Sequence, residues 1–195
     1  MCWRDDVPME RRCEFCHRNY FGSLGHKNCP KFLNKEMADK VIHDVLEAVF
    51  KNFGVKRTDC HVRVLAPTIE DEWANDYPSW PNYSLKWEPL TDFSAGTPEK
   101  WEHKYDEHTG CKMVQGLTGR SDGRTIVPHL LFRGETVYAG YVEVDMIRVT
   151  CSGFDECDDR MTAGMIAHGI VAAATRAFNA SRAPGGEDYG KEFLT

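Results

Sequence analysis

The run of residues 161–175 contains no charged side chain, and it constrains the fold more than any other stretch of the chain. It is too short to span a bilayer comfortably, and the acids at 155–159 precede it, where negative charge complements a helix dipole. We therefore predict a helix that is buried on most sides, with small residues that allow a neighbouring backbone to approach closely. That neighbour is the sheet, another helix or a second copy of the chain. His168 lies in this run and is expected to be a hydrogen-bonded core histidine.

Residues 34–53 have the pattern of an amphipathic helix. Asn34 suits an N-cap, apolar side chains recur at intervals of three and four, and Gly54 suits a C-terminal stop. Residues 60–66 then alternate in the period of a strand, which Pro67 closes. We predict one helix and one strand here.

Residues 101–151 have a pattern of antiparallel strands separated by turn residues. The predicted strands cover residues 101–105, 111–118, 125–132 and 136–151. In the last of these the apolar side shifts after Met146, which a bulge or a change to full burial would explain. Together the elements predict an α+β fold, with an antiparallel sheet of four to five strands and two helices packed on one face of it.

The chain divides into three parts on composition. Residues 1–33 form an arm and a small cysteine-rich module, residues 34–182 the α+β domain, and residues 183–195 a flexible tail. Residues 67–100, rich in proline and aromatic residues, are expected to form a long loop with little regular structure. Its tryptophans either cap the sheet or anchor a protein contact: Trp73, Trp80 and Trp87.

The cysteine-rich module contains the strongest motif in the sequence. Cys13 and Cys16 are followed by His26 and Cys29, so two pairs with the same internal spacing offer the four corners of a tetrahedron. This spacing predicts a Cys3His zinc site, against the alternative of unbound thiols. Four protein ligands leave no open position for water, so the Zn²⁺ is expected to be structural.

Residues 13–29 resemble short zinc fingers and zinc ribbons in these ligand pairs and in the aromatic Phe21 between them. The helix-borne histidine pair of such fingers is missing, so base reading by a finger helix is not expected. Phosphate contact by nearby basic residues stays open, against the alternative of solvated charges around the zinc. These residues are Arg11, Arg12, Arg18, Lys27 and Lys31.

Charge and hydropathy narrow the classes of function. The net charge is −6, but residues 1–57 sum to +3 and residues 58–195 to −9, so any nucleic-acid contact is expected in the N-terminal part. No apolar run is long enough for a membrane span, and the N-terminus lacks the pattern of a signal peptide. We expect a protein of the cytoplasm, or of a virion assembled inside the cell, with no membrane contact.

Signals for catalysis are weak. His103, His108 and Cys111 surround a predicted turn where they could approach one metal ion, but a plain turn is the preferred interpretation. Residues 119–123 fit the pattern G-x-S-x-G, yet no helix is expected after them, so we predict a hairpin turn. An enzyme with a cleft containing His103, His108 or His168 remains an alternative hypothesis.

The order of helix, strand, long excursion, antiparallel strands and final helix is similar to that of tail-terminator and neck proteins of tailed phages. The corresponding stretches are residues 35–53, 60–66 and 137–178. The resemblance implies a ring-forming structural subunit. The leading hypothesis is a non-catalytic, zinc-stabilised assembly or adaptor subunit that forms a homo-oligomer or binds a protein partner. The alternatives are a nucleic-acid-binding protein that uses the basic zinc module, or the histidine enzyme.

Overall fold

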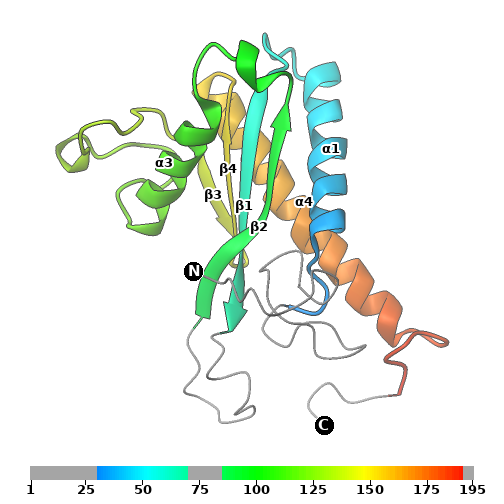
Figure 1. Cartoon of the computed structure of the whole chain (residues 1–195). Helices are drawn as coiled ribbons and strands as arrows, with labels where there is room; N and C mark the ends of the chain where they lie inside the picture. Colours follow the sequence, from blue (N-terminus) through cyan, green and yellow to red (C-terminus); the bar gives the residue numbers. More distant parts are fainter. Residues whose placement is uncertain (1–29, 70–84, 191–195) are drawn as a thin grey trace, which may run out of the picture.

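A computed structural model describes residues 30–69 and 85–190 of the chain. Its strands are β1 (Cys60–Ile69), β2 (Leu85–Ala95), β3 (Tyr141–Val144) and β4 (Ile147–Ser152), and its α-helices are α1 (Lys35–Asn52), α3 (Tyr105–Leu117) and α4 (Glu156–Arg182). The strands form one antiparallel sheet in the order β2-β1-β4-β3 (Figure 1). The predicted α+β class is confirmed, with three helices in place of the two expected. The predicted zinc module lies outside the described residues.

Helix α1 has the predicted bounds. The side chain of Asn34 accepts a hydrogen bond from the Met37 backbone N–H at 2.8 Å, which satisfies a donor that the first turn leaves free. Beyond the C-cap, Gly54 has a φ of 65°, a conformation that costs glycine little. The capping residue Asn34 and the glycine at position 54 were therefore sufficient to predict both ends of α1.

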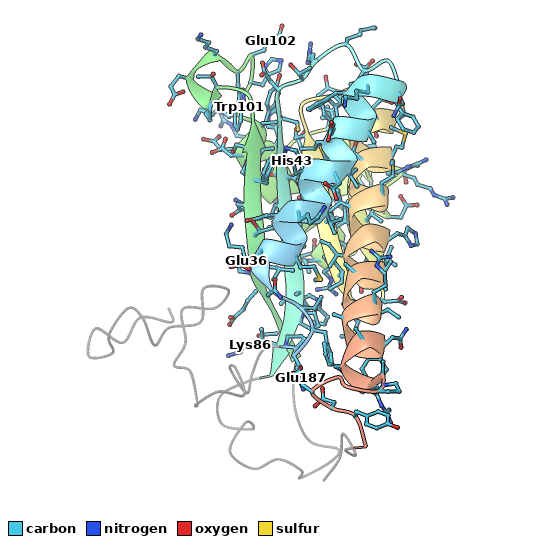
Figure 2. All side chains as sticks on the ribbon, turned by 90° about the vertical axis from the view of Figure 1, so that its right-hand side faces the viewer. Glu36, His43, Lys86, Trp101, Glu102 and Glu187 are labelled. Carbon is cyan, nitrogen blue, oxygen red and sulfur yellow. The ribbon has the colours of Figure 1, made fainter. Side chains whose placement is uncertain are left out.

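The two faces of the sheet carry different helices. On one face Val62 and Val64 of β1 join Val149 of β4 in a fully buried core with α1 and α4. Figure 2 shows these two helices on the same side of the sheet. Side chains alternate along a strand, so their neighbours point the other way, toward α3. There the hydroxyl of Thr150 donates to the Thr109 carbonyl oxygen at 3.1 Å. Helices α1 and α4 therefore share one face, as predicted, and α3 covers part of the opposite face (Figure 1).

Helix α4 contains the uncharged run, in which five residues are buried, eight are half-buried and two are exposed. Ile166 and Ile170 face the core, whereas His168 is exposed on the outer side. The prediction of a core histidine is therefore wrong. The close approach expected of the small residues does occur, because a Cβ on Gly169 would lie 2.6 Å from Val41 Cγ1 of α1.

The strands predicted at 101–105 and 111–118 are wrong. Most of this segment is helix α3, which buries Thr109, Lys112 and Gln115 together with Tyr105 and Met113. When about half of the buried side chains of a helix are polar, apolar residues no longer recur every 3.6 residues in the sequence. Periodicity alone therefore favoured the wrong element.

Three further predictions are corrected by the structure. The strand predicted at 136–151 is a hairpin, because Asp145 and Met146 take φ angles of 45° and 68° in the two-residue turn between β3 and β4. The strand predicted at 125–132 is replaced by turns and a 3-10 helix at Pro128–Leu130. Strand β2 lies inside the loop predicted at 67–100.

The hairpin of β1 and β2 is longer than the rest of the sheet. Strand β4 pairs with β1 only from His61 to Leu65, whereas the pairing of β1 with β2 continues to Ile69 and Leu85. The far end of the hairpin therefore extends beyond the other two strands (Figure 1). In the described part of the chain, none of the helices is both long enough and apolar enough to cross a membrane.

Candidate protein-interaction surface

Exposed apolar side chains are concentrated in one part of the sequence. Nine large apolar side chains are exposed among the described residues, and six of them lie between positions 114 and 138. Two are on α3, and four are on residues 118–140, which we call the excursion because they leave the sheet before β3 begins (Figure 1). We call the six the apolar loop surface: Val114, Leu117, Leu130, Phe132, Val137 and Tyr138. Exposed apolar side chains that gather in one patch mark a binding site, and these six residues are its candidate members.

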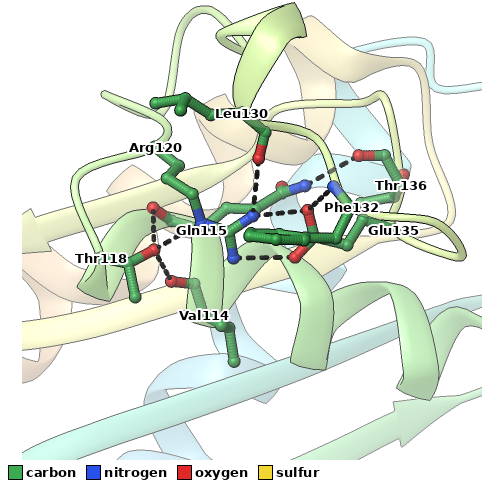
Figure 3. Close-up of polar contacts among 8 residues, drawn as sticks. All are labelled: Val114, Gln115, Thr118, Arg120, Leu130, Phe132, Glu135 and Thr136. Atoms are coloured by element: carbon green, nitrogen blue, oxygen red, sulfur yellow. Dashed lines mark hydrogen bonds and ion pairs between the residues drawn. The ribbon is translucent and has the colours of Figure 1, made fainter.

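Arg120 holds the excursion in shape (Figure 3). Its two terminal nitrogens donate to the two carboxylate oxygens of Glu135 at 2.6 and 2.7 Å. The same guanidinium donates to the Leu130 carbonyl oxygen at 3.1 Å and, through Nε, to Thr118 Oγ1 at 2.9 Å. One side chain thus connects the start, the middle and the end of the excursion. Bidentate arginine–carboxylate pairs combine strength with fixed geometry.

Glu135 completes this connection. Its Oε2 also accepts the Phe132 backbone N–H at 3.0 Å. The hydrogen bonds from Arg120, followed by that from Phe132, lower the pKa of Glu135 to about 2. The carboxylate is therefore charged throughout the neutral and mildly acidic range, and the pair with Arg120 persists there.

Phe132 is displayed on top of this ion pair. The Arg120 guanidinium carbon lies 4.8 Å from the centre of the ring, while 67% of the residue surface is exposed. A cation held against one face of an aromatic ring fixes the ring without burying it. The other side of the ring is available for contact.

The excursion is seated on β3 by a tight turn. Asp122 Oδ1 accepts the backbone N–H groups of Arg124 and Thr125 at 2.7 and 2.8 Å, and these bonds lower the pKa of Asp122. A Cβ on Gly123 would lie 1.9 Å from the Tyr141 carbonyl oxygen, and its φ is 81°, so glycine is required there. Residues 119–123 therefore form a turn, but not the predicted hairpin turn, because helix α3 and not a strand precedes it.

Polar contacts also fasten the far end of the excursion. Gln115 of α3 donates to the Thr136 carbonyl oxygen at 2.9 Å, and the Ala139 N–H donates to Glu156 of α4 at 3.1 Å. The segment between these contacts displays Val137 and Tyr138. The far end of the excursion is thus attached to both α3 and α4, while Val137 and Tyr138 are exposed.

A second polar group lies on β1 and β2. His61 Nδ1 is 2.9 Å from Ser94 Oγ, and His61 Nε2 is 3.6 Å from an oxygen of Asp92. These are the residue types of a serine hydrolase, but Arg63 donates to that same Asp92 oxygen at 2.6 Å. Burial would raise the pKa of Asp92, and the bonds from His61 and Arg63 outweigh it and lower that pKa. We interpret the group as a cross-strand polar ladder that stabilises the hairpin.

Most residues of the predicted zinc site and basic patch lie outside the described part of the chain: Cys13, Cys16, His26, Cys29, Arg11, Arg12, Arg18 and Lys27. Lys31 is described and pairs with Asp188 at 2.6 Å, and the hydrogen bond to Asp188 raises its pKa. The structure therefore places one member of the basic patch on a carboxylate of its own chain.

Of the predicted contact tryptophans, Trp73 and Trp80 lie outside the described residues. Trp87 is on β2, where its indole N–H donates to the Met146 carbonyl oxygen at 3.1 Å. The Arg148 guanidinium carbon lies 3.6 Å from the centre of its ring. The side chain of Trp87 thus connects β2 to the β3–β4 hairpin.

The candidate histidines are only partly brought together. The rings of His103 and His108 stack with centroids 6.2 Å apart, and burial, followed by the charge of Lys112, lowers the pKa of His108. Cys111 is half-buried on the same helix. Across residues 30–69 and 85–190, no three His, Cys, Asp or Glu side chains are placed to hold a metal ion.

Sequence reasoning missed the apolar loop surface because its residues were assigned to strands. Pro128 lies inside one of those strands and was the available signal, since proline is confined to strand edges and bulges. The pairing of Arg120 with Glu135 had no signal in the sequence.

Comparison with known proteins adds no assignment. No protein-family model matches the chain, and neither the curated proteins nor the solved structures give a significant match to it.

Proposed function

We propose that the chain is a non-catalytic assembly or adaptor subunit, stabilised by zinc in its N-terminal module, that associates with further copies of itself through the apolar loop surface. The supporting observation is the way the excursion is built. Arg120 and Glu135 pair with each other inside the excursion, while Phe132 and its apolar neighbours remain exposed.

A surface built in this way suits association. Ordering a loop on binding costs conformational entropy, and a loop that is already ordered avoids this cost. Phenylalanine and tyrosine supply large contact areas, as Phe132 and Tyr138 would here. A virion neck-type or tail-type component is one subunit of this class, and we keep it as part of the proposal.

Native mass spectrometry of the full-length protein, purified without added metal, tests the proposal. We expect a defined oligomer with one zinc ion per chain. The double variant Phe132→Ser, Tyr138→Ser should be monomeric because it removes the two aromatic side chains of the surface. Its far-UV circular dichroism should match that of the wild type, since neither side chain is in the core.

The matched control removes two exposed aromatic side chains elsewhere, in the variant Phe53→Ser, Tyr189→Ser. It should keep the wild-type oligomer. A wild-type monomer at all protein concentrations, or an oligomer that survives the loss of Phe132 and Tyr138, would contradict the proposal.

A further inference from the structure

The excursion, which carries four of the six residues of the apolar loop surface, is positively charged. Arg124 and Arg133 are exposed, and neither forms an ion pair with any residue in the described ranges. The excursion contains two acids: Glu135, which is neutralised by Arg120, and Asp122, whose Oδ1 accepts backbone N–H groups. The excursion therefore has a net positive charge in a chain whose net charge is −6.

The complementary chemistry is present elsewhere in the same chain. Residues 70–84 lie outside the described structure, and their sequence contains four acids and no lysine, arginine or histidine. The same fifteen residues contain four aromatic side chains: Trp73, Tyr77, Trp80 and Tyr83. Carboxylates pair with guanidinium groups, and aromatic rings both stack on arginine and fill apolar surfaces. This segment suits the excursion in charge and in apolar character.

The position of the segment favours a contact between two copies. Both of its ends are attached at the far end of the hairpin, where Ile69 pairs with Leu85. The excursion packs against Tyr141 of β3. Through the pairing of β3 with β4 and of β4 with β1, Tyr141 is in register with Arg63, which precedes Ile69 by six residues. At about 3.3 Å per residue this separation is roughly 20 Å along the sheet.

A segment that must leave and return to the hairpin end reaches at most about 25 Å when half of its residues run outward fully extended. The backbone of the excursion projects sideways from the sheet, away from the hairpin (Figure 1). Residues 70–84 would therefore have to be almost fully extended to reach the excursion of their own chain. The excursion of a neighbouring copy can be approached without this requirement.

We propose that the apolar loop surface of one copy binds residues 70–84 of a second copy. The inference rests on the proposed function, because it names the partner of that surface. Each copy has one segment and one surface, so two copies can exchange segments reciprocally, or the contact can continue from copy to copy. Contacts that continue in this way close into a ring or extend as a filament.

A charge-swap experiment with the full-length protein tests this inference. The first variant, R124E/R133E, makes the excursion acidic, and the second, D71K/E72K/D76K, makes the segment basic because only Glu70 then remains against three lysines. In sedimentation velocity at 0.15 M NaCl, each variant alone should associate at least about tenfold more weakly than the wild type, because like charges then face each other. An equimolar mixture should regain association, since the basic segment of one variant meets the acidic surface of the other.

The control R160E/R176E reverses two exposed arginines on α4 and should associate like the wild type. Four results would overturn the inference: charge variants that associate normally, a control that is weakened as much as they are, a mixture that does not recover, or a wild-type monomer. A mixture that fails to recover would point to docking within one chain.

The two proposals fail in different ways. If the variant Phe132→Ser, Tyr138→Ser is monomeric while both charge variants associate normally, the surface is a contact but residues 70–84 are not its partner. A wild-type monomer contradicts both proposals.

Discussion

The buried ion pair between Lys112 and Asp159 yields the sharpest prediction about stability. Lys112 Nζ lies 2.7 Å from Asp159 Oδ2, and the two side chains are only 1% and 3% exposed. The same ammonium donates to the Cys151 carbonyl oxygen at 2.8 Å, and Asp159 Oδ1 accepts the Phe154 N–H at 3.0 Å. The pair thus connects α3, β4 and the first turn of α4 in a site that excludes water.

Replacing Lys112 with methionine keeps most of the side-chain volume but leaves the Asp159 carboxylate without its cation. Breaking a buried pair in this way costs about 3–5 kcal/mol. We expect a loss of this size in the free energy of unfolding at pH 8, measured by urea titration with tryptophan fluorescence. The double variant Lys112→Met, Asp159→Asn removes both charges. It should lose less stability than the single variant, by about 2 kcal/mol or more.

The pH dependence provides a separate check. Burial raises the pKa of Asp159 to about 6, although the charge of Lys112 opposes the rise. Without Lys112 this pKa should rise further. A carboxyl group whose pKa is higher in the folded state than in the unfolded state binds its proton preferentially in the folded state. Its stabilising contribution is therefore complete below the unfolded value near 4 and is lost as pH rises through the folded value.

The penalty for Lys112→Met should accordingly be smaller at pH 5 than at pH 8. The comparison must be made against the wild type at each pH, because carboxylates with lowered pKa values, such as Glu135, change stability in the opposite direction on acidification. A loss below about 1 kcal/mol at pH 8, a double variant whose loss equals the sum of the two single losses, or a penalty that grows toward acid would refute the reasoning.

Two further predictions concern the excursion and the N-terminal module. Replacing Arg120 with methionine removes the connection to Glu135 and to the Leu130 carbonyl. Chymotrypsin should then cleave the excursion at Phe132 faster than in the wild type, whereas equal rates would mean that this arginine does not hold the loop. Replacing Cys16 with serine should abolish zinc retention in native mass spectrometry, and unchanged metal content would remove the zinc assignment.

The elements that the sequence alone predicted correctly are those with strong local signals. The Asn34 cap, the 3.6-residue period and Gly54 define α1, and a period of two defines the start of β1. The uncharged run predicted α4, but it did not predict which side is exposed. Exposure depends on where the helix lies relative to the sheet, and this is why the side chain of His168 points to solvent.

Tertiary structure decided the remaining features, since they depend on residues that are distant in sequence. Helix α3 has a polar buried face because Lys112 meets Asp159, forty-seven positions later. Leu130 and Phe132 of the apolar loop surface are exposed in a loop that Arg120 and Glu135 connect across fifteen positions. Periodicity reports burial only where the buried side chains are apolar. Where burial depends on paired charges, the partner must be known before the pattern can be interpreted.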